Sequence, residues 1–246
     1  YVMFFTTRGR TYRLKGYEVP EGSRNSKGMN IVNLLPLEAG EKVSAMIRVP
    51  EYDPDAFLCM VTRKGIIKRT SLDAYRNVRK NGVIAINLDD DDELAWVRLT
   101  SGNDDLLIAT RKGMGIRFNE NDARPLGRTA RGVKAIELRE GDEVVGMEVL
   151  DDAKAVLTVS TTGYGRRSEP SDYRLQSRGG KGTINYRTET YGDVAAIAVV
   201  DESEDVIFIS SDGIIIRIPV SQISTFARPS TRVRVMRVSE GEQLVT

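Results

Sequence analysis

Short apolar runs, each broken by a turn, recur along the whole chain. A strand-like run, a turn that contains glycine and a second run occur five times, around Gly9, Gly65, Gly113, Gly163 and Gly213. By subtraction, these turn glycines are 56, 48, 50 and 50 residues apart. The pattern predicts five β-hairpins, one in each repeat of about 50 residues. The repeats are 1–50, 56–100, 104–150, 154–201 and 205–246.

Each repeat continues with a basic loop, a third apolar run, an acidic turn and a fourth run. The third run reads GVIAINL from Gly82, and the fourth reads ELAWVRL from Glu93. Runs this short leave little room for helices, so we expect an all-β chain with four strands per repeat. Such antiparallel units cannot hide both faces alone, which favours stacking around an axis as a propeller-like disc and a single domain over 1–246. Closure by five blades, or by six with one before Tyr1, stays open.

The composition argues against catalysis and metal binding by this chain. It contains no histidine and one cysteine, Cys59, inside the apolar run FLCMVT. Without histidine the usual acid–base residue is missing, and with one cysteine an ordinary zinc site and a disulfide framework are excluded. We therefore expect no catalytic residue, no metal site and no cofactor. No apolar run approaches 18 residues, so we expect a soluble protein without a membrane partner, and the single cysteine favours a reducing, cytoplasmic compartment.

The net charge is only +1, since 36 Lys and Arg offset 35 Asp and Glu, so the positions of the charges must carry the argument. The basic loop that follows the hairpin in each repeat is called its second loop. Together the five second loops hold twelve bases and hardly an acid: Arg24, Lys27, Arg76, Arg79, Lys80, Arg128, Arg131, Arg174, Arg178, Lys181, Arg228 and Arg232. The hairpins add Arg8, Arg10, Arg63, Lys64, Lys68, Arg69, Arg111, Lys112, Arg166 and Arg167. Acids gather in the turn before the fourth run, as in Asp89 to Glu93. This distribution predicts a basic edge of the disc and a separate acidic region.

A basic edge suits a long polyanion, and Arg, Lys and backbone amides hold DNA phosphates without reading bases. The strongest single site is the loop QSRGGKG, in which glycines can bring amides close to an anion. Its residues are Gln176, Arg178, Gly179, Gly180, Lys181 and Gly182. If about ten phosphates are contacted, log affinity should fall against log salt with a slope of about −9.

The chain resembles the C-terminal DNA-wrapping domain of the DNA gyrase A family over essentially its whole length. The resemblance lies in QSRGGKG, the TxxGxxxR hairpins, GYEVPEGSRNSKGMNIVNLLPLE and GRTARGVKAIELREGDEVVGM. It implies a β-pinwheel, usually of six blades that exchange a strand with their neighbours. It further implies that double-stranded DNA wraps around the basic rim within a holoenzyme of two A and two B subunits. That ATP-dependent type II topoisomerase uses ATP and Mg²⁺ elsewhere and is associated with the nucleoid.

Two departures from the family pattern qualify the resemblance. The family box reads QRRGGKG in the first blade, whereas in this chain Ser177 replaces an arginine and the loop lies in the fourth repeat. The resemblance therefore implies a secondary box, with the principal one before Tyr1. Arg232 also stands where the other repeats have glycine, which predicts a different loop shape. The C-terminal domain of the topoisomerase IV A-type chain is the nearest alternative, followed by a propeller scaffold for protein docking and a propeller hydrolase.

Overall fold

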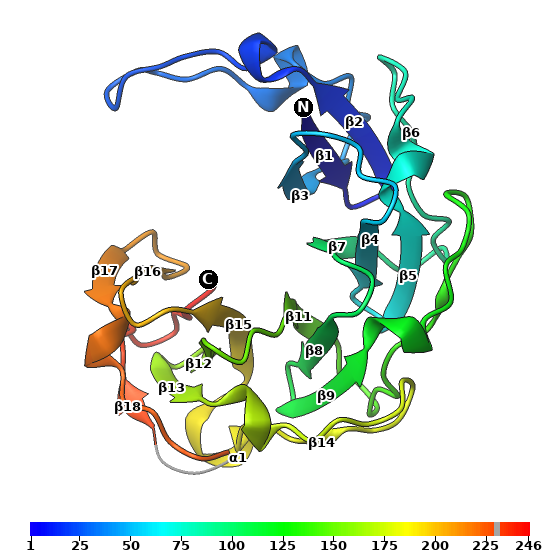
Figure 1. The fold of residues 1–246 in the computed structure, drawn as a ribbon. Coiled ribbons are helices and arrows are strands. Elements are labelled where there is room, and N and C mark those ends of the chain that lie inside the picture. Colours follow the sequence, from blue (N-terminus) through cyan, green and yellow to red (C-terminus); the bar gives the residue numbers. More distant parts are fainter. Residues whose placement is uncertain (229–231) are drawn as a thin grey trace. The chain divides into compact units, whose positions relative to one another are not determined.

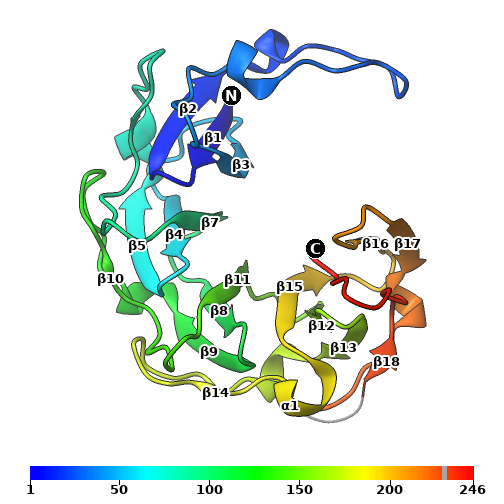
Figure 2. The same cartoon turned by 180° about the vertical axis from the view of Figure 1, so that it is seen from behind.

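The structure is a computed structural model that describes residues 1–228 and 232–246. It confirms the all-β prediction, with four four-stranded antiparallel sheets and one two-stranded sheet (Figures 1 and 2). The only α-helix in the described ranges is the single turn α1 (Thr188–Tyr191). Short 3-10 turns occupy Gly16–Glu18, Ile31–Asn33, Leu72–Tyr75, Glu120–Asp122, Pro170–Asp172 and Val220–Gln222. None of the described helices is long and apolar enough to cross a membrane.

Neighbouring strands in each sheet follow a common spatial order. The first sheet contains β3 (Val43–Arg48), β1 (Val2–Thr6), β2 (Arg10–Leu14) and β6 (Val83–Ile84). The second contains β10 (Val133–Lys134), β5 (Ile66–Ser71), β4 (Phe57–Thr62) and β7 (Leu94–Thr100). The third contains β11 (Val144–Val149), β8 (Asp105–Thr110), β9 (Met114–Asn119) and β14 (Thr183–Ile184). The fourth contains β15 (Val194–Val200), β12 (Ala155–Ser160), β13 (Tyr164–Ser168) and β18 (Val233–Arg234), and the last hairpin is β16 (Asp205–Ile209) with β17 (Ile215–Pro219).

Each four-stranded sheet takes its fourth strand from the following repeat. The third run forms only a two-residue strand, and it pairs with the preceding hairpin, as β6 does with β2 through Arg10 opposite Ile84 and Thr11 opposite Val83. Strands β14 and β18 pair with β9 and β13 in the same way. Strand exchange, which the resemblance implied, is therefore present. The expectation of four strands from each repeat is corrected, because one strand of every four-stranded sheet is borrowed.

A turn glycine makes this exchange possible. The Gly113 carbonyl accepts the backbone amides of Asn185 and Tyr186 at 2.7 and 3.1 Å. A side chain at Gly113 would place its Cβ 2.1 Å from the Tyr186 carbonyl oxygen, and the φ of +89° is one that other residues rarely adopt. The turn at Gly213 has a similar φ of +83°, but nothing lies within 4 Å of a Cβ built there. The two turns thus share a conformation and differ in crowding.

The chain divides into two compact units, one formed by residues 1–102 with 123–133 and one by residues 103–122 with 134–246. In the first unit, Phe5 packs edge-on against Tyr75 within a buried cluster that joins the first two repeats. In the second unit, Val159 and Phe208 belong to a cluster that joins the fourth and fifth repeats. Each unit therefore contains a core cluster that two consecutive repeats share, and the first repeat also has a smaller cluster of its own around Phe4, Tyr12 and Leu35.

Replacing Gly113 by alanine should destabilise the protein far more than the same change at Gly213. Both variants bear the cost of a positive φ, about 1 kcal/mol, but only Gly113→Ala also forces the borrowed run away. We expect a total loss of about 3 kcal/mol or more for Gly113→Ala, measured by urea unfolding. Equal losses in the two variants would mean that the close approach contributes nothing.

Candidate nucleic-acid interface

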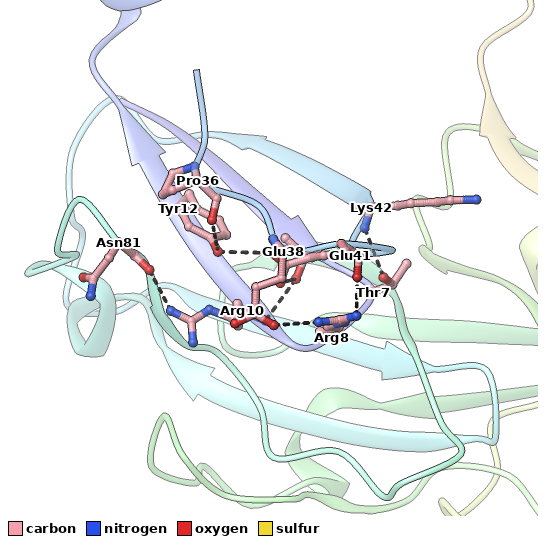
Figure 3. Close-up of polar contacts among 11 residues, drawn as sticks. Thr7, Arg8, Arg10, Tyr12, Pro36, Glu38, Glu41, Lys42 and Asn81 are labelled. Carbon is pink, nitrogen blue, oxygen red and sulfur yellow. Dashed lines mark hydrogen bonds and ion pairs between the residues drawn. The ribbon is translucent and has the colours of Figure 1, made fainter. Parts of the chain in front are cut away.

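The basic hairpin turn of the first repeat lies directly beside its acidic turn (Figure 3). Arg8 forms an ion pair with Glu38 at 2.6 Å and also donates to the Ala39 carbonyl. The Thr7 amide donates to the Lys42 carbonyl at 2.8 Å, which joins the two turns through their backbones. The charge of Arg8 is therefore neutralised within its own repeat.

The hairpin turns of the next two repeats also contact their acidic turns, through ion pairs in the second repeat and through hydrogen bonds to backbone carbonyls in the third. Arg63 contacts Glu93 at 3.2 Å, and Lys64 forms an ion pair with Asp91. Further along, Arg111 donates to the Gly141 carbonyl at 2.5 Å, and Lys112 donates to the Glu140 carbonyl at 2.5 Å. The predicted separation of a basic edge from an acidic region is thus wrong for the hairpin turns. The fourth run of each repeat pairs with the first strand of its hairpin, so the acidic turn that precedes it must end beside the hairpin turn.

The acidic turn of the second repeat also neutralises a loop base. Arg131 donates from Nε and Nη2 to the two carboxylate oxygens of Asp89, at 2.7 and 2.6 Å. The hydrogen bonds from Arg131 lower the pKa of Asp89, and those from Lys64 lower the pKa of Asp91. Two acids of this turn are therefore held in ion pairs with bases that the sequence had assigned to DNA.

Lys68, on β5, is completely buried. Its Nζ donates to the carbonyls of Ala85, Arg128 and Gly127 at 2.5, 2.6 and 3.2 Å, and it lies 3.2 Å from the Tyr75 hydroxyl. Burial, with a smaller contribution from the charge of Arg128, lowers the pKa of Lys68 to about 7. Lys68 therefore fastens the second and third repeats from inside the first unit and has no surface from which to reach a ligand.

The equivalent strand β13 buries Arg166 and Arg167. Arg166 donates to the Ser168 hydroxyl at 2.8 Å and to the Asn185 carbonyl at 2.7 Å, while Arg167 donates to the Ile223 carbonyl. Arg69, next to Lys68, is likewise buried and donates to the Ala123 carbonyl. This corrects the expectation that these arginines lie on the exposed surface. They follow the turn glycine by three or four residues and so belong to the second strand rather than to the turn.

Three loop arginines 50 residues apart bind the backbone of the preceding repeat. Arg178 donates from Nε to the Asp122 carbonyl at 3.1 Å and from Nη1 to the Lys134 carbonyl at 2.5 Å. The side chain of Arg228 repeats this with the carbonyls of Asp172 and Ile184. The third, Arg128, donates to the Ile84 carbonyl at 2.6 Å. These guanidinium groups hold the basic loops of the third, fourth and fifth repeats against the repeat that precedes each of them.

The QSRGGKG loop is consequently more structural than its sequence indicates. The amides of Gln176 and Gly179 donate to the carbonyls of Arg117 and Ala135, at 2.9 and 2.8 Å. A Cβ at Gly182 would lie 2.3 Å from a backbone oxygen, so this glycine allows close packing of the loop. Gly180 has nothing nearer than 4.0 Å. The side chain of Lys181 is exposed and stays available.

The twelve second-loop bases divide into two equal groups. Six have exposed side chains without a hydrogen bond or ion pair to any described residue: Arg24, Lys27, Arg79, Lys80, Arg174 and Lys181. The other six have partners: Arg76 with Asp73, Arg131 with Asp89, Arg128, Arg178 and Arg228 with carbonyls, and Arg232 with the ring of Tyr191. The fifth loop itself crosses residues 229–231, so its predicted change of shape lies outside the described residues. Three loops thus present two free bases each.

Sequence reasoning missed two arginines near these loops. Arg124 is exposed in the third loop, just before Pro125, and its place inside a basic loop was a usable signal. Arg13 lies on β2, four residues after the turn glycine Gly9, and donates to the Arg76 carbonyl at 2.6 Å. An arginine occupies the same offset in all five hairpins, at 13, 69, 117, 167 and 217, so this signal was also present.

The fold and its loops define an all-β repeat protein with exposed basic loops. Comparison with known families is consistent with this class. The family model described as "DNA gyrase C-terminal domain, beta-propeller" matches residues 1–50, 56–101, 104–151, 154–201 and 204–246. The chain belongs to this family, and the resemblance drawn from its motifs is confirmed.

Curated relatives match about half of the chain. The A subunit of DNA gyrase from Clostridium acetobutylicum is 57% identical over 129 residues, and that from Staphylococcus epidermidis is 53% identical over 131 residues. These alignments cover 52% and 53% of this chain but only 16% and 15% of the relatives. The matched region is therefore a small part of those proteins.

Two solved structures share the fold over the whole chain. A C-terminal domain of DNA topoisomerase IV superimposes with a TM-score of 0.90 at 23% identity, over 100% of this chain and 77% of that one. A DNA gyrase A C-terminal domain gives 0.85 at 25% identity, over 100% of this chain and 80% of that one. The topoisomerase IV likeness establishes the fold alone.

Replacing Arg178 by alanine should destabilise the protein, whereas replacing Lys181 should not. Removal of Arg178 deletes two hydrogen bonds to backbone carbonyls at exposed positions, each typically worth about 0.5–1.5 kcal/mol. The exposed Lys181 has no partner in the described chain, so we expect a change within about 0.5 kcal/mol. Urea unfolding of the two variants beside the parent chain measures both, and a neutral Arg178→Ala would contradict a structural role.

Proposed function

We propose that this chain binds double-stranded DNA through its phosphate backbone and bends or wraps it. The observation that carries the proposal is the group of six exposed, unpartnered loop bases: Arg24, Lys27, Arg79, Lys80, Arg174 and Lys181. Exposed charges of one sign on repeated loops attract a polyanion and release its counterions on binding. The other loop bases support this role indirectly, because they hold the loops in place.

The chemistry of these six side chains favours phosphate contacts over base readout. Reading a base requires a side chain fixed in a groove, often a bidentate arginine. None of the six has a described partner that would fix its orientation, and phosphate contacts require little more than charge. We therefore expect weak sequence selectivity and steep dependence on salt.

Membership of the gyrase C-terminal domain family extends the proposal to a larger assembly. We propose that the chain acts as part of an ATP-dependent type II topoisomerase, in which two A and two B subunits introduce negative supercoils. In that assembly ATP and Mg²⁺ would act outside this chain, and the complex would work in the cytoplasm on nucleoid DNA. The gyrase relatives support this assignment over the topoisomerase IV alternative.

The salt dependence of DNA affinity tests how many bases take part. If six bases each meet a phosphate, a plot of log affinity against log salt should have a slope of about −5, rather than the value of about −9 that ten contacts require. Lys181→Gln should make the slope shallower by about 1 on every sequence tested. Fluorescence anisotropy with a labelled duplex between about 50 and 300 mM salt would measure both, and a slope near zero would refute the proposal.

A charge-conserving control separates free bases from paired ones. The double change Arg63→Gln with Glu93→Gln removes one base and its partner without altering the net charge. Its slope should equal that of the parent chain. A loss as large as that of Lys181→Gln would show that the hairpin turns also contact DNA.

Relaxation of circular DNA distinguishes wrapping from simple binding. A nicked circle is sealed in the presence of increasing amounts of the chain, and the topoisomers are separated on a gel. Chiral wrapping should give a progressive positive shift in linking number. Binding without any shift would mean that the chain only bends or tethers DNA, which would favour a role like that of the topoisomerase IV domain.

A further inference from the structure

An open groove of about 550 Å³ crosses the first unit. Its wall includes Arg10 and Arg13 from β2, Arg79 from the basic loop of the second repeat and Arg128 from the basic loop of the third repeat. No carboxylate is among the described residues that form its wall. Three consecutive repeats therefore place four guanidinium groups along one groove.

The partners of these arginines leave their charge uncompensated. Arg10 donates to the Asn81 carbonyl at 2.6 Å (Figure 3), and Arg128 donates to the Ile84 carbonyl at 2.6 Å. Arg13 donates to a carbonyl and to a tyrosine hydroxyl. These acceptors are neutral, and among the described residues none of the four arginines has an ion pair. The groove thus differs from the hairpin turns of the first two repeats, where acids neutralise the bases.

The free donors of the groove lie on Arg79, because the Nε of Arg10, which has no hydrogen-bond partner among the described residues, is buried and out of reach of a ligand. Arg79 is exposed and has no partner in the described chain, so its whole guanidinium fork is available. A guanidinium fork matches the geometry of phosphate oxygens and binds them with charge-assisted hydrogen bonds. The chemistry of the groove therefore favours phosphate over a neutral ligand.

The groove also lies on the weakest joint of the first sheet. Strand β6 is held to β2 by only two residue pairs, Arg10 opposite Ile84 and Thr11 opposite Val83. Arg10 belongs to the accepting strand and Arg79 to the loop that delivers the borrowed one. A ligand that contacts both would connect the two repeats across this joint.

We propose that this groove is a seat for two adjacent phosphate groups, and that their binding fastens the borrowed strand β6 to β2. Two successive phosphates of a DNA strand and a free pyrophosphate present the same chemistry. The inference rests on the proposed function for the DNA source, whereas the pyrophosphate interaction stands on the groove alone.

Pyrophosphate titration of the whole chain tests the seat directly. The probe should bind the parent chain, seen by calorimetry, and should raise its melting temperature. Arg79→Ala should weaken pyrophosphate binding by about tenfold, since the arginine is exposed and its loss leaves the fold intact. Lys42→Ala removes an equal charge from an exposed side chain of the same unit that does not line the groove, and it should leave pyrophosphate affinity unchanged. Failure of pyrophosphate to bind, or equal losses in both variants, would overturn the seat.

A saturating short duplex distinguishes the two sources of phosphate. If DNA phosphates occupy the groove, the duplex should abolish pyrophosphate binding to the parent chain. If both ligands bind together, the seat serves free phosphates and the DNA assignment is overturned. A chain that binds pyrophosphate but no duplex at any salt concentration would refute the proposed function and leave the seat standing. A chain that binds duplex normally but no pyrophosphate would overturn the seat and leave the proposed function standing.

Discussion

The turn glycines carry the interaction on which the rest of this structure depends. Each of the carbonyls of Gly9, Gly113 and Gly163 accepts two backbone amides from the following repeat. A backbone can approach that closely only where no side chain intervenes. The borrowed two-residue strand, the shared cores between repeats and the positions of the basic loops that lead into these amides follow from this contact. The repeat of about 50 residues is therefore a repeat of the sequence, whereas the contacts that hold the fold together join one repeat to the next.

The charged residues divide according to their distance from that joint. Lys68 and Arg167 lie inside it and bind carbonyl oxygens of the following repeat. Arg178 reaches back across it from the loop. Only the outermost side chains, such as Lys181 and Lys80, are left without a partner in the described chain. A count of bases in the sequence therefore overstates the number available to DNA, since basic residues serve first as long hydrogen-bond donors between repeats.

Much of the fold could be predicted from the sequence, because the turn glycines and the alternation of short apolar runs are local signals. The borrowed strand could not, since nothing in the run GVIAINL indicates which hairpin it joins. Among the site residues, Lys181 and Arg79 were correctly placed on exposed loops. Arg166 and Arg167 were not, because their place within a strand depends on where the turn ends. The ion pairs of the hairpin turns could not be predicted either. They form because the first and fourth runs of a repeat pair in the sheet, and no single segment of the sequence shows that pairing.

The spacing of Arg128, Arg178 and Arg228 has a consequence for how such a chain can change over generations. Each arginine reaches carbonyls 44 and 56 residues earlier wherever both contacts are made. A duplicated stretch of one full period carries both a donor arginine and the carbonyls that the next copy needs, whatever residue it begins with. Gain or loss of whole periods therefore preserves every joint, whereas a short insertion between carbonyl and arginine breaks one. Repeat number in this architecture is free to vary in steps, and among the last three repeats a side chain sets the length of the step at 50 residues.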